Sequence, residues 1–153
     1  MQKKATLKGF TLIEILVVVG LIAILAAITI VAINPAKNFA DTRNTQRSAD
    51  VQQILNAVVQ YTSEPGNTLA AFGTIPLCDA TPAPISAVTT GTPPAGTINL
   101  YTLLVDEYIA AIPMDPNGGT EANTGYTICQ TSGQRVEVAA PGAENGKEIK
   151  VRK

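Results

Sequence analysis

The sequence predicts an α+β protein in which a long N-terminal hydrophobic helix packs against a small antiparallel sheet of three strands. Three observations lead to this fold class. An apolar run of 19 residues, from Ile15 to Ile33, contains no charge. An apolar stripe at helical spacing follows in residues 51–61, and the last thirty or so residues alternate between apolar and polar. Because a small sheet is not stable alone, we expect the stripe to cover its apolar face.

The composition argues against most catalytic chemistry. The 153 residues include no His and only two Cys, so a His-based triad, a His metal ligand and a four-thiolate zinc site are excluded. We therefore expect a protein that is not an enzyme and that needs no cofactor. The net charge of −1 also argues against a surface built for nucleic acid, which is not an expected partner.

The first element in chain order is the apolar run from Ile15 to Ile33, which is long enough to span a membrane. At about 1.5 Å of rise per residue it covers about 28 Å, close to the thickness of the hydrocarbon core. Lys3, Lys4 and Lys8 precede the run, and the next basic residue is Lys37. This asymmetry places the N-terminus in the cytoplasm and the rest of the chain outside it.

The helical pattern resumes after the apolar run as an amphipathic segment over residues 34–64. Two interpretations remain open at its start: Asn34 caps a new helix with Pro35 at its first position, or Pro35 kinks one continuous helix. Pro65-Gly66 ends the segment. Its first part, residues 37–50, is polar and is expected to form a solvated face whose ion pairs contribute only tenths of a kcal/mol each.

The remaining residues, 65–153, are expected to form a small α+β head. Residues 65–98 are rich in Pro, Gly and Thr and predict a loop. Apolar residues at helical spacing between Leu100 and Ile112 predict a short amphipathic helix, which Pro113 ends. The three strands are expected around Tyr126 and Ile128, Val136 and Val138, and Ile149 and Val151.

Glu14 is the one charged residue among the apolar residues that begin the helix at Phe10. A carboxylate at membrane depth costs about 2 to 3 kcal/mol or more, so it requires a cationic partner. If the chain is cut between Gly9 and Phe10, the new amine on Phe10 is such a cation. The amine can bind Glu14 of its own chain or of a neighbouring chain, and the second case predicts assembly.

The motif from Lys8 to Glu14, followed by a long apolar helix, resembles the prepilin signature of type IV pilins and type II secretion pseudopilins. The head resembles these pilin-like proteins more loosely, through residues 108–116 and 125–127. The resemblance implies a structural subunit of a filament, with residues 1–9 as a leader and 10–33 as the transmembrane and filament-core helix. It implies cleavage after Gly9, N-methylation of Phe10, and pairing of Glu14 with the N-terminal amine of an adjacent subunit.

The partners and location also follow from the resemblance. It implies a prepilin peptidase and methyltransferase, identical or related pilin subunits, membrane lipid before assembly, and an inner-membrane assembly platform. The precursor is then a single-pass protein of the cytoplasmic membrane with an extracytoplasmic head. Family members often carry a helix-kinking proline where this chain has Val31, so we expect the helix bend between Gly20 and Pro35.

Two alternatives to a filament subunit remain open. One is a membrane-anchored binding module that does not polymerise, and the other is an exported soluble protein whose first thirty or so residues are removed. Within the filament interpretation, the sequence does not distinguish a pilus from a secretion pseudopilus.

Two weaker signals lie in the head. Cys78 and Cys129 form an even pair in an exported segment, which favours a disulfide, with two separate thiols as the alternative. Asp115, Asn117 and Glu121 supply oxygens and lie among turn-forming glycines, as in a calcium loop. Their spacing differs from the helix-loop-helix calcium motif, so a plain turn is the stronger interpretation.

Overall fold

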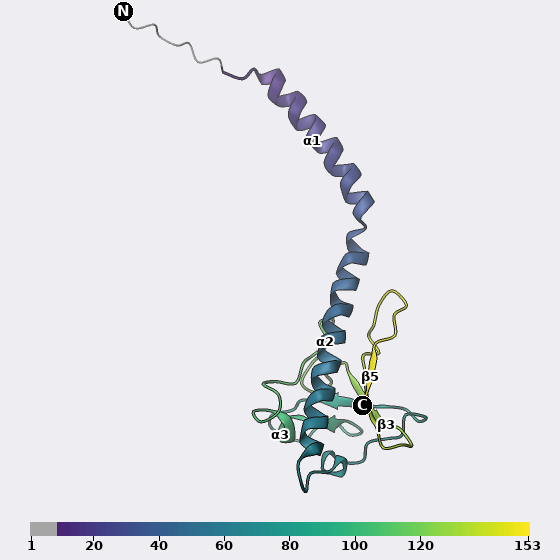
Figure 1. The fold of residues 1–153 in the computed structure, drawn as a ribbon. Coiled ribbons are helices and arrows are strands. Elements are labelled where there is room, and N and C mark those ends of the chain that lie inside the picture. The colour runs from purple at the N-terminus through teal and green to yellow at the C-terminus, as the bar shows by residue number, and fades with distance from the viewer. Residues whose placement is uncertain (1–8) are drawn as a thin grey trace, which may run out of the picture. The chain divides into compact units, whose positions relative to one another are not determined.

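The computed structural model describes residues 9–153, and the leader lysines at positions 3, 4 and 8 lie outside the described residues. The chain forms two compact units, which meet in sequence between Asn38 and Phe39. The first unit contains the helix α1 (Leu12–Ile33) and the start of α2 (Pro35–Ser63). The second unit, which we call the head, contains the rest of α2 and the sheet (Figure 1).

Helix α1 is apolar around its whole circumference and has no buried residue within the chain. It begins after Thr11, whose hydroxyl caps the first turn. Its 22 residues correspond to about 33 Å of helix. Length and composition therefore suit α1 to crossing a membrane, as expected for the apolar run.

The two helices are separated by Asn34. Asn34 adopts a left-handed conformation (φ 47°, ψ 74°) that ends α1, and its Oδ1 accepts a 3.3 Å hydrogen bond from the backbone N–H of Lys37. Pro35 occupies the first position of α2, where its missing N–H costs nothing. Of the two interpretations, the new helix capped by Asn34 is therefore the one observed. Gly20 lies inside α1, which is uninterrupted there.

The core of the head forms where the apolar stripe of α2 covers the sheet. The stripe residues are buried: Val51, Ile54, Leu55, Val58 and Tyr61. They belong to the same core cluster as Ile128 and Val138 from the sheet. The predicted packing of the stripe on the strands is thus confirmed.

The sheet has five strands rather than the three predicted, although the α+β class is confirmed. The strands are β1 (Ala83–Ser86), β2 (Ile98–Asn99), β3 (Thr127–Gln130), β4 (Val136–Ala139) and β5 (Lys150–Arg152). Their order is β2-β1-β3-β4-β5, with β1 and β2 parallel and the other neighbours antiparallel. The three predicted strands correspond to β3, β4 and β5.

The segment 65–98, predicted as a loop, contains the 3₁₀ helix η1 (Leu69–Phe72), β1 and the start of β2. Both strands are short, at 4 and 2 residues, and Pro84 lies within β1. Such strands carry too few residues to show a period of two. Their stability comes from neighbours distant in sequence, which sequence patterns do not reveal.

The helix predicted between Leu100 and Ile112 is wrong in extent, because only α3 (Tyr101–Leu104) is helical. Val105 is extended, and Asp106 has a φ of +75°, which ends the helical turn. Ile112 is nevertheless buried in the core. The apolar residues of this segment thus reach the core from an irregular chain.

Candidate functional site

The processing and assembly residues predicted from the sequence lie around the start of α1. Gly9 and Phe10 precede the helix, and Phe10 is 85% exposed. Glu14 lies in the first turn of α1, where it forms a capping box with Thr11. The backbone N–H and the hydroxyl of Thr11 donate to Glu14 Oε2 at 2.7 and 2.8 Å.

This capping box changes the environment expected for Glu14. The sequence predicts a cationic partner for the carboxylate, whereas in the structure Thr11 supplies two hydrogen bonds to Oε2. The T-x-x-E pattern before an apolar run is a capping-box signature and was visible in the sequence. Among residues 9–153, no hydrogen bond joins a donor to Glu14 Oε1, so this oxygen can accept a further donor.

A second charged site lies in the head and centres on Arg47, whose side chain is 1% exposed. Its Nε and Nη2 donate to Asp115 Oδ2 and Oδ1 at 2.7 and 2.9 Å, and its Nη1 donates to Glu144 Oε2 at 2.8 Å. The solvated face predicted for residues 37–50 is therefore wrong at Arg47. The polar pattern of α2 gave no signal for this burial, because the partners come from distant segments.

The network joins the loop between β4 and β5 to α2. Glu144 also accepts two hydrogen bonds from Arg43, at 2.7 and 2.6 Å, and its main chain pairs with the Asn44 side chain. The hydrogen bonds from Arg43 and Arg47 lower the pKa of Glu144 to about 2. The hydrogen bonds from Arg47 likewise lower the pKa of Asp115. Both carboxylates are therefore ionised at neutral pH.

The calcium candidates are arranged as a turn around this network. Both Asp115 oxygens accept from Arg47, and Asp115 Oδ1 also accepts from the backbone N–H of Asn117 at 2.8 Å. Glu121 is exposed, and its backbone carbonyl accepts from Ala87. A guanidinium thus occupies the oxygens that a cation would need, so the geometry favours the plain turn.

Glycines allow the backbone to approach Asp115 closely. A Cβ on Gly125 would lie 2.6 Å from the Cβ of Asp115, and a Cβ on Gly119 would lie 2.5 Å from its backbone nitrogen. A Cβ on Gly142 would lie 3.0 Å from Asp115 Oδ2. Two separate loops therefore close over the buried ion pair only because these positions lack a side chain.

Asp50, also expected on the solvated face, is buried next to the network. Its Oδ2 accepts a 2.6 Å hydrogen bond from the Tyr126 hydroxyl, and Tyr126 is fully buried. Burial raises the pKa of Asp50, although the hydrogen bond from Tyr126 opposes this shift. Burial, together with the nearby Asp50 carboxylate, also raises the pKa of Tyr126.

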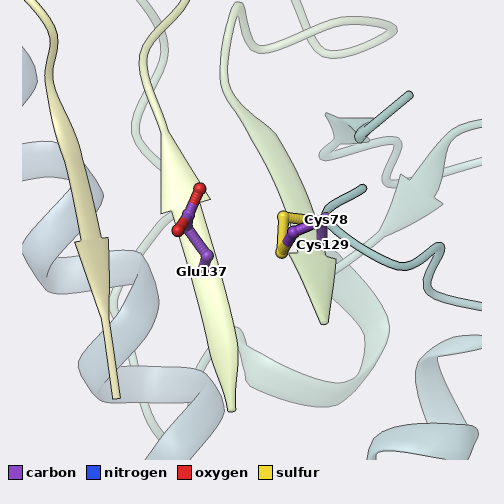
Figure 2. A group of neighbouring side chains, drawn as sticks. All are labelled: Cys78, Cys129 and Glu137. Atoms are coloured by element: carbon purple, nitrogen blue, oxygen red, sulfur yellow. A yellow bond between two sulfur atoms is a disulfide. The ribbon is translucent and has the colours of Figure 1, made fainter. Parts of the chain in front are cut away.

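A disulfide joins Cys78, in the loop before β1, to Cys129 in β3 (Figure 2). Glu137 lies on the neighbouring strand β4, directly opposite Cys129 in the register. The three residues have the chemistry of metal ligands, but both sulfurs are bonded to each other and Glu137 pairs with Arg152. The arrangement therefore functions as a cross-link.

The chain thus combines an apolar helix long enough to cross a membrane with a disulfide-bonded α+β head, which fits a membrane-anchored protein. The sequence model for the prokaryotic N-terminal methylation motif matches residues 7–30. The chain thus carries the prepilin signature of type IV pilins and pseudopilins, as predicted. This signature is typical of structural subunits. No curated protein and no solved structure matches the chain.

Proposed function

We propose that this protein is the precursor of a structural subunit of a type IV pilus-like or type II secretion pseudopilus filament. A prepilin peptidase cleaves it after Gly9 and methylates the new N-terminus at Phe10. The mature protein stays in the cytoplasmic membrane with its head outside. An inner-membrane assembly platform then incorporates it into a filament at the cell surface or in the periplasm.

The observation that carries the proposal is that the methylation motif at residues 7–30 coincides with the start and most of α1. Every residue of α1 is exposed within the chain, including large side chains such as Leu16 and Ile24. Such a helix must be covered by lipid or by other helices. The same segment therefore suits both an anchor before assembly and a filament core after it.

Glu14 supports a link between processing and assembly. The Thr11 cap engages Oε2, while Oε1 has room for a donor. Cleavage after Gly9 supplies that donor as the N-methylammonium of Phe10 on a neighbouring subunit. An ion pair of this kind removes the cost of a lone carboxylate in an apolar environment.

Mass spectrometry of the mature protein from its native host tests the proposed processing. A chain that begins with N-methylated Phe10 is the expected result. An intact Met1 on a strictly monomeric protein would instead support the membrane-anchored binding module. A start beyond Ala27 would support the exported soluble protein.

Two substitutions test the role of Glu14. Glu14→Gln keeps a capping-box residue at the third helical position but removes the charge. Thr11→Val removes the capping hydroxyl but keeps the charge. We expect Glu14→Gln to lose most filament incorporation while the protein remains stable in the membrane, and Thr11→Val to retain it. Normal incorporation of Glu14→Gln would refute the pairing mechanism.

A further inference from the structure

The charges of the head are strongly segregated along the sequence. Residues 48–134 contain seven acidic residues and no Lys or Arg. Residues 135–153 contain five basic residues against three acidic ones. Because two of the seven acids, Asp50 and Asp115, are buried, the others determine the surface charge of the central part of the head.

Three of the exposed acids lie at the end of α2 or just after α3, and we call them the acidic surface: Glu64, Asp106 and Glu107. The Tyr108 hydroxyl donates to Glu64 Oε2 at 2.6 Å, which joins the end of α2 to the segment after α3. Glu64 and Glu107 are both close enough to help raise the pKa of Tyr108 to about 12. Within residues 9–153, none of the three acids has an ion pair with Lys or Arg.

The opposite charge is concentrated on the strand at one edge of the sheet. Lys150, Arg152 and Lys153 are exposed on β5 and just after it, and we call them the basic edge. Lys150 pairs with Glu148, and Arg152 pairs with Glu137. Lys153 has no ion pair in the described part of the chain. Exposed pairs such as Lys150 with Glu148 are weak and exchange readily with other partners.

The two surfaces come from different elements of the head. In the sheet order, β5 is at one edge and β2, which leads directly into α3, is at the other. Figure 1 likewise shows α3 and β5 on different sides of α2. One head therefore presents complementary charges on separate elements. When identical subunits contact each other through two different patches, each subunit keeps one patch free for a further subunit. Such contacts can therefore continue as a helical array.

We propose that the basic edge of one head docks on the acidic surface of the next copy of this chain in the filament. This inference rests on the proposed function, because a filament provides the repeated head-to-tail neighbours that such a contact requires. Charges on an edge strand also prevent unwanted strand pairing. That role alone gives no reason for an exposed acidic surface on the same head.

Charge reversal in the full-length protein tests the contact. Lys150→Glu/Lys153→Glu reverses the basic edge, and Asp106→Lys/Glu107→Lys reverses the acidic surface. We expect each double variant to reduce filament yield about tenfold, which corresponds to about 1.4 kcal/mol at each contact. Like charges opposed across an interface are sufficient for an effect of this size.

Complementation gives the sharpest outcome. The two double variants expressed together, and the variant that carries all four reversals, should both recover filaments, because opposite charges face each other again. Asp79→Lys is the matched control: it reverses an exposed acid beside the disulfide and should leave filament yield unchanged. Circular dichroism and membrane levels of each variant show whether the protein still folds.

The outcomes separate this inference from the proposed function. Normal yield from both double variants would overturn the docking contact while leaving the filament proposal intact. Loss of yield in folded double variants without recovery on complementation would also overturn it. If the unaltered protein forms no filament in its native host, the proposed function itself fails.

Discussion

Arg47 is the residue whose replacement should damage the head most. Its guanidinium is buried with two hydrogen bonds to Asp115, whose side chain is only 6% exposed. Arg47→Met keeps much of the apolar stem but leaves the Asp115 carboxylate buried without its cation. Removing one partner of a buried ion pair typically costs about 3 to 5 kcal/mol, a large share of the about 5 to 15 kcal/mol that stabilises a domain.

Urea unfolding of the full chain in detergent micelles, followed by near-ultraviolet circular dichroism of the tyrosines, measures this loss. Urea is preferable to guanidinium because it does not screen charges. The second variant, Arg47→Met/Asp115→Asn, removes both charges and should recover part of the stability lost in Arg47→Met, because no buried charge remains unpaired.

Arg43→Met is the matched control. Arg43 also pairs with Glu144, but its side chain is 32% exposed, so the same substitution should cost far less. A loss of less than about 1 kcal/mol in Arg47→Met, or a double variant no more stable than Arg47→Met, would refute this role of the buried ion pair.

Further predictions concern titration and cross-linking. Above its ordinary pKa of 4.5, Glu144 contributes its full stabilisation, which is lost as the pH falls through about 2, so Glu144→Gln should show a flatter acid-unfolding curve by circular dichroism. Burial raises the pKa of Asp50, so ionisation of this carboxyl lowers the free energy of unfolding as the pH rises from its ordinary pKa to the raised one. Asp50→Asn carries no such charge. Its stability relative to the unaltered protein should therefore be greater at pH 7 than at pH 3 in urea titrations. Tyr126→Phe leaves Asp50 without its donor and should lower the free energy of unfolding by about 1 to 3 kcal/mol in the same assay. Cys78→Ser/Cys129→Ser opens a loop of 51 residues and should cost about 4 kcal/mol on the chain-entropy model; an unchanged melting temperature, with no effect of reductant on the unaltered protein, would contradict this.

The sequence predicted those parts of the fold whose signal is local and long. The apolar run, the stripe of α2 from Val51 to Tyr61 and the alternating strands β3 to β5 repeat over enough residues for a period to be visible. The strands β1 and β2 have no such repeat. The parallel pairing of Ile85 with Ile98 depends on segments that only the folded chain brings together.

The sites divide in the same way. Gly9, Phe10 and Glu14 form a continuous motif, and the matching methylation motif spans them. The burial of Arg47 could not be read from α2, because it depends on Asp115 and Glu144, which are 68 and 97 residues away. A lone Arg among polar residues on a helix usually signals a solvated face. Only the tertiary fold shows that Arg47 joins α2 to the two loops that carry Asp115 and Glu144.

The three glycines around Asp115 restrict how this protein can vary. Positions such as Asn117 and Thr120 are exposed and tolerate many side chains, whereas Gly119 and Gly125 offer no space even for a methyl group. In a library randomised at positions 117, 119, 120, 121 and 125, selection for a folded head should therefore return glycine at positions 119 and 125 and broad diversity at the other three. Sequence changes during evolution are therefore expected at the exposed positions of this loop, whereas the glycines that contact Asp115 are expected to be retained.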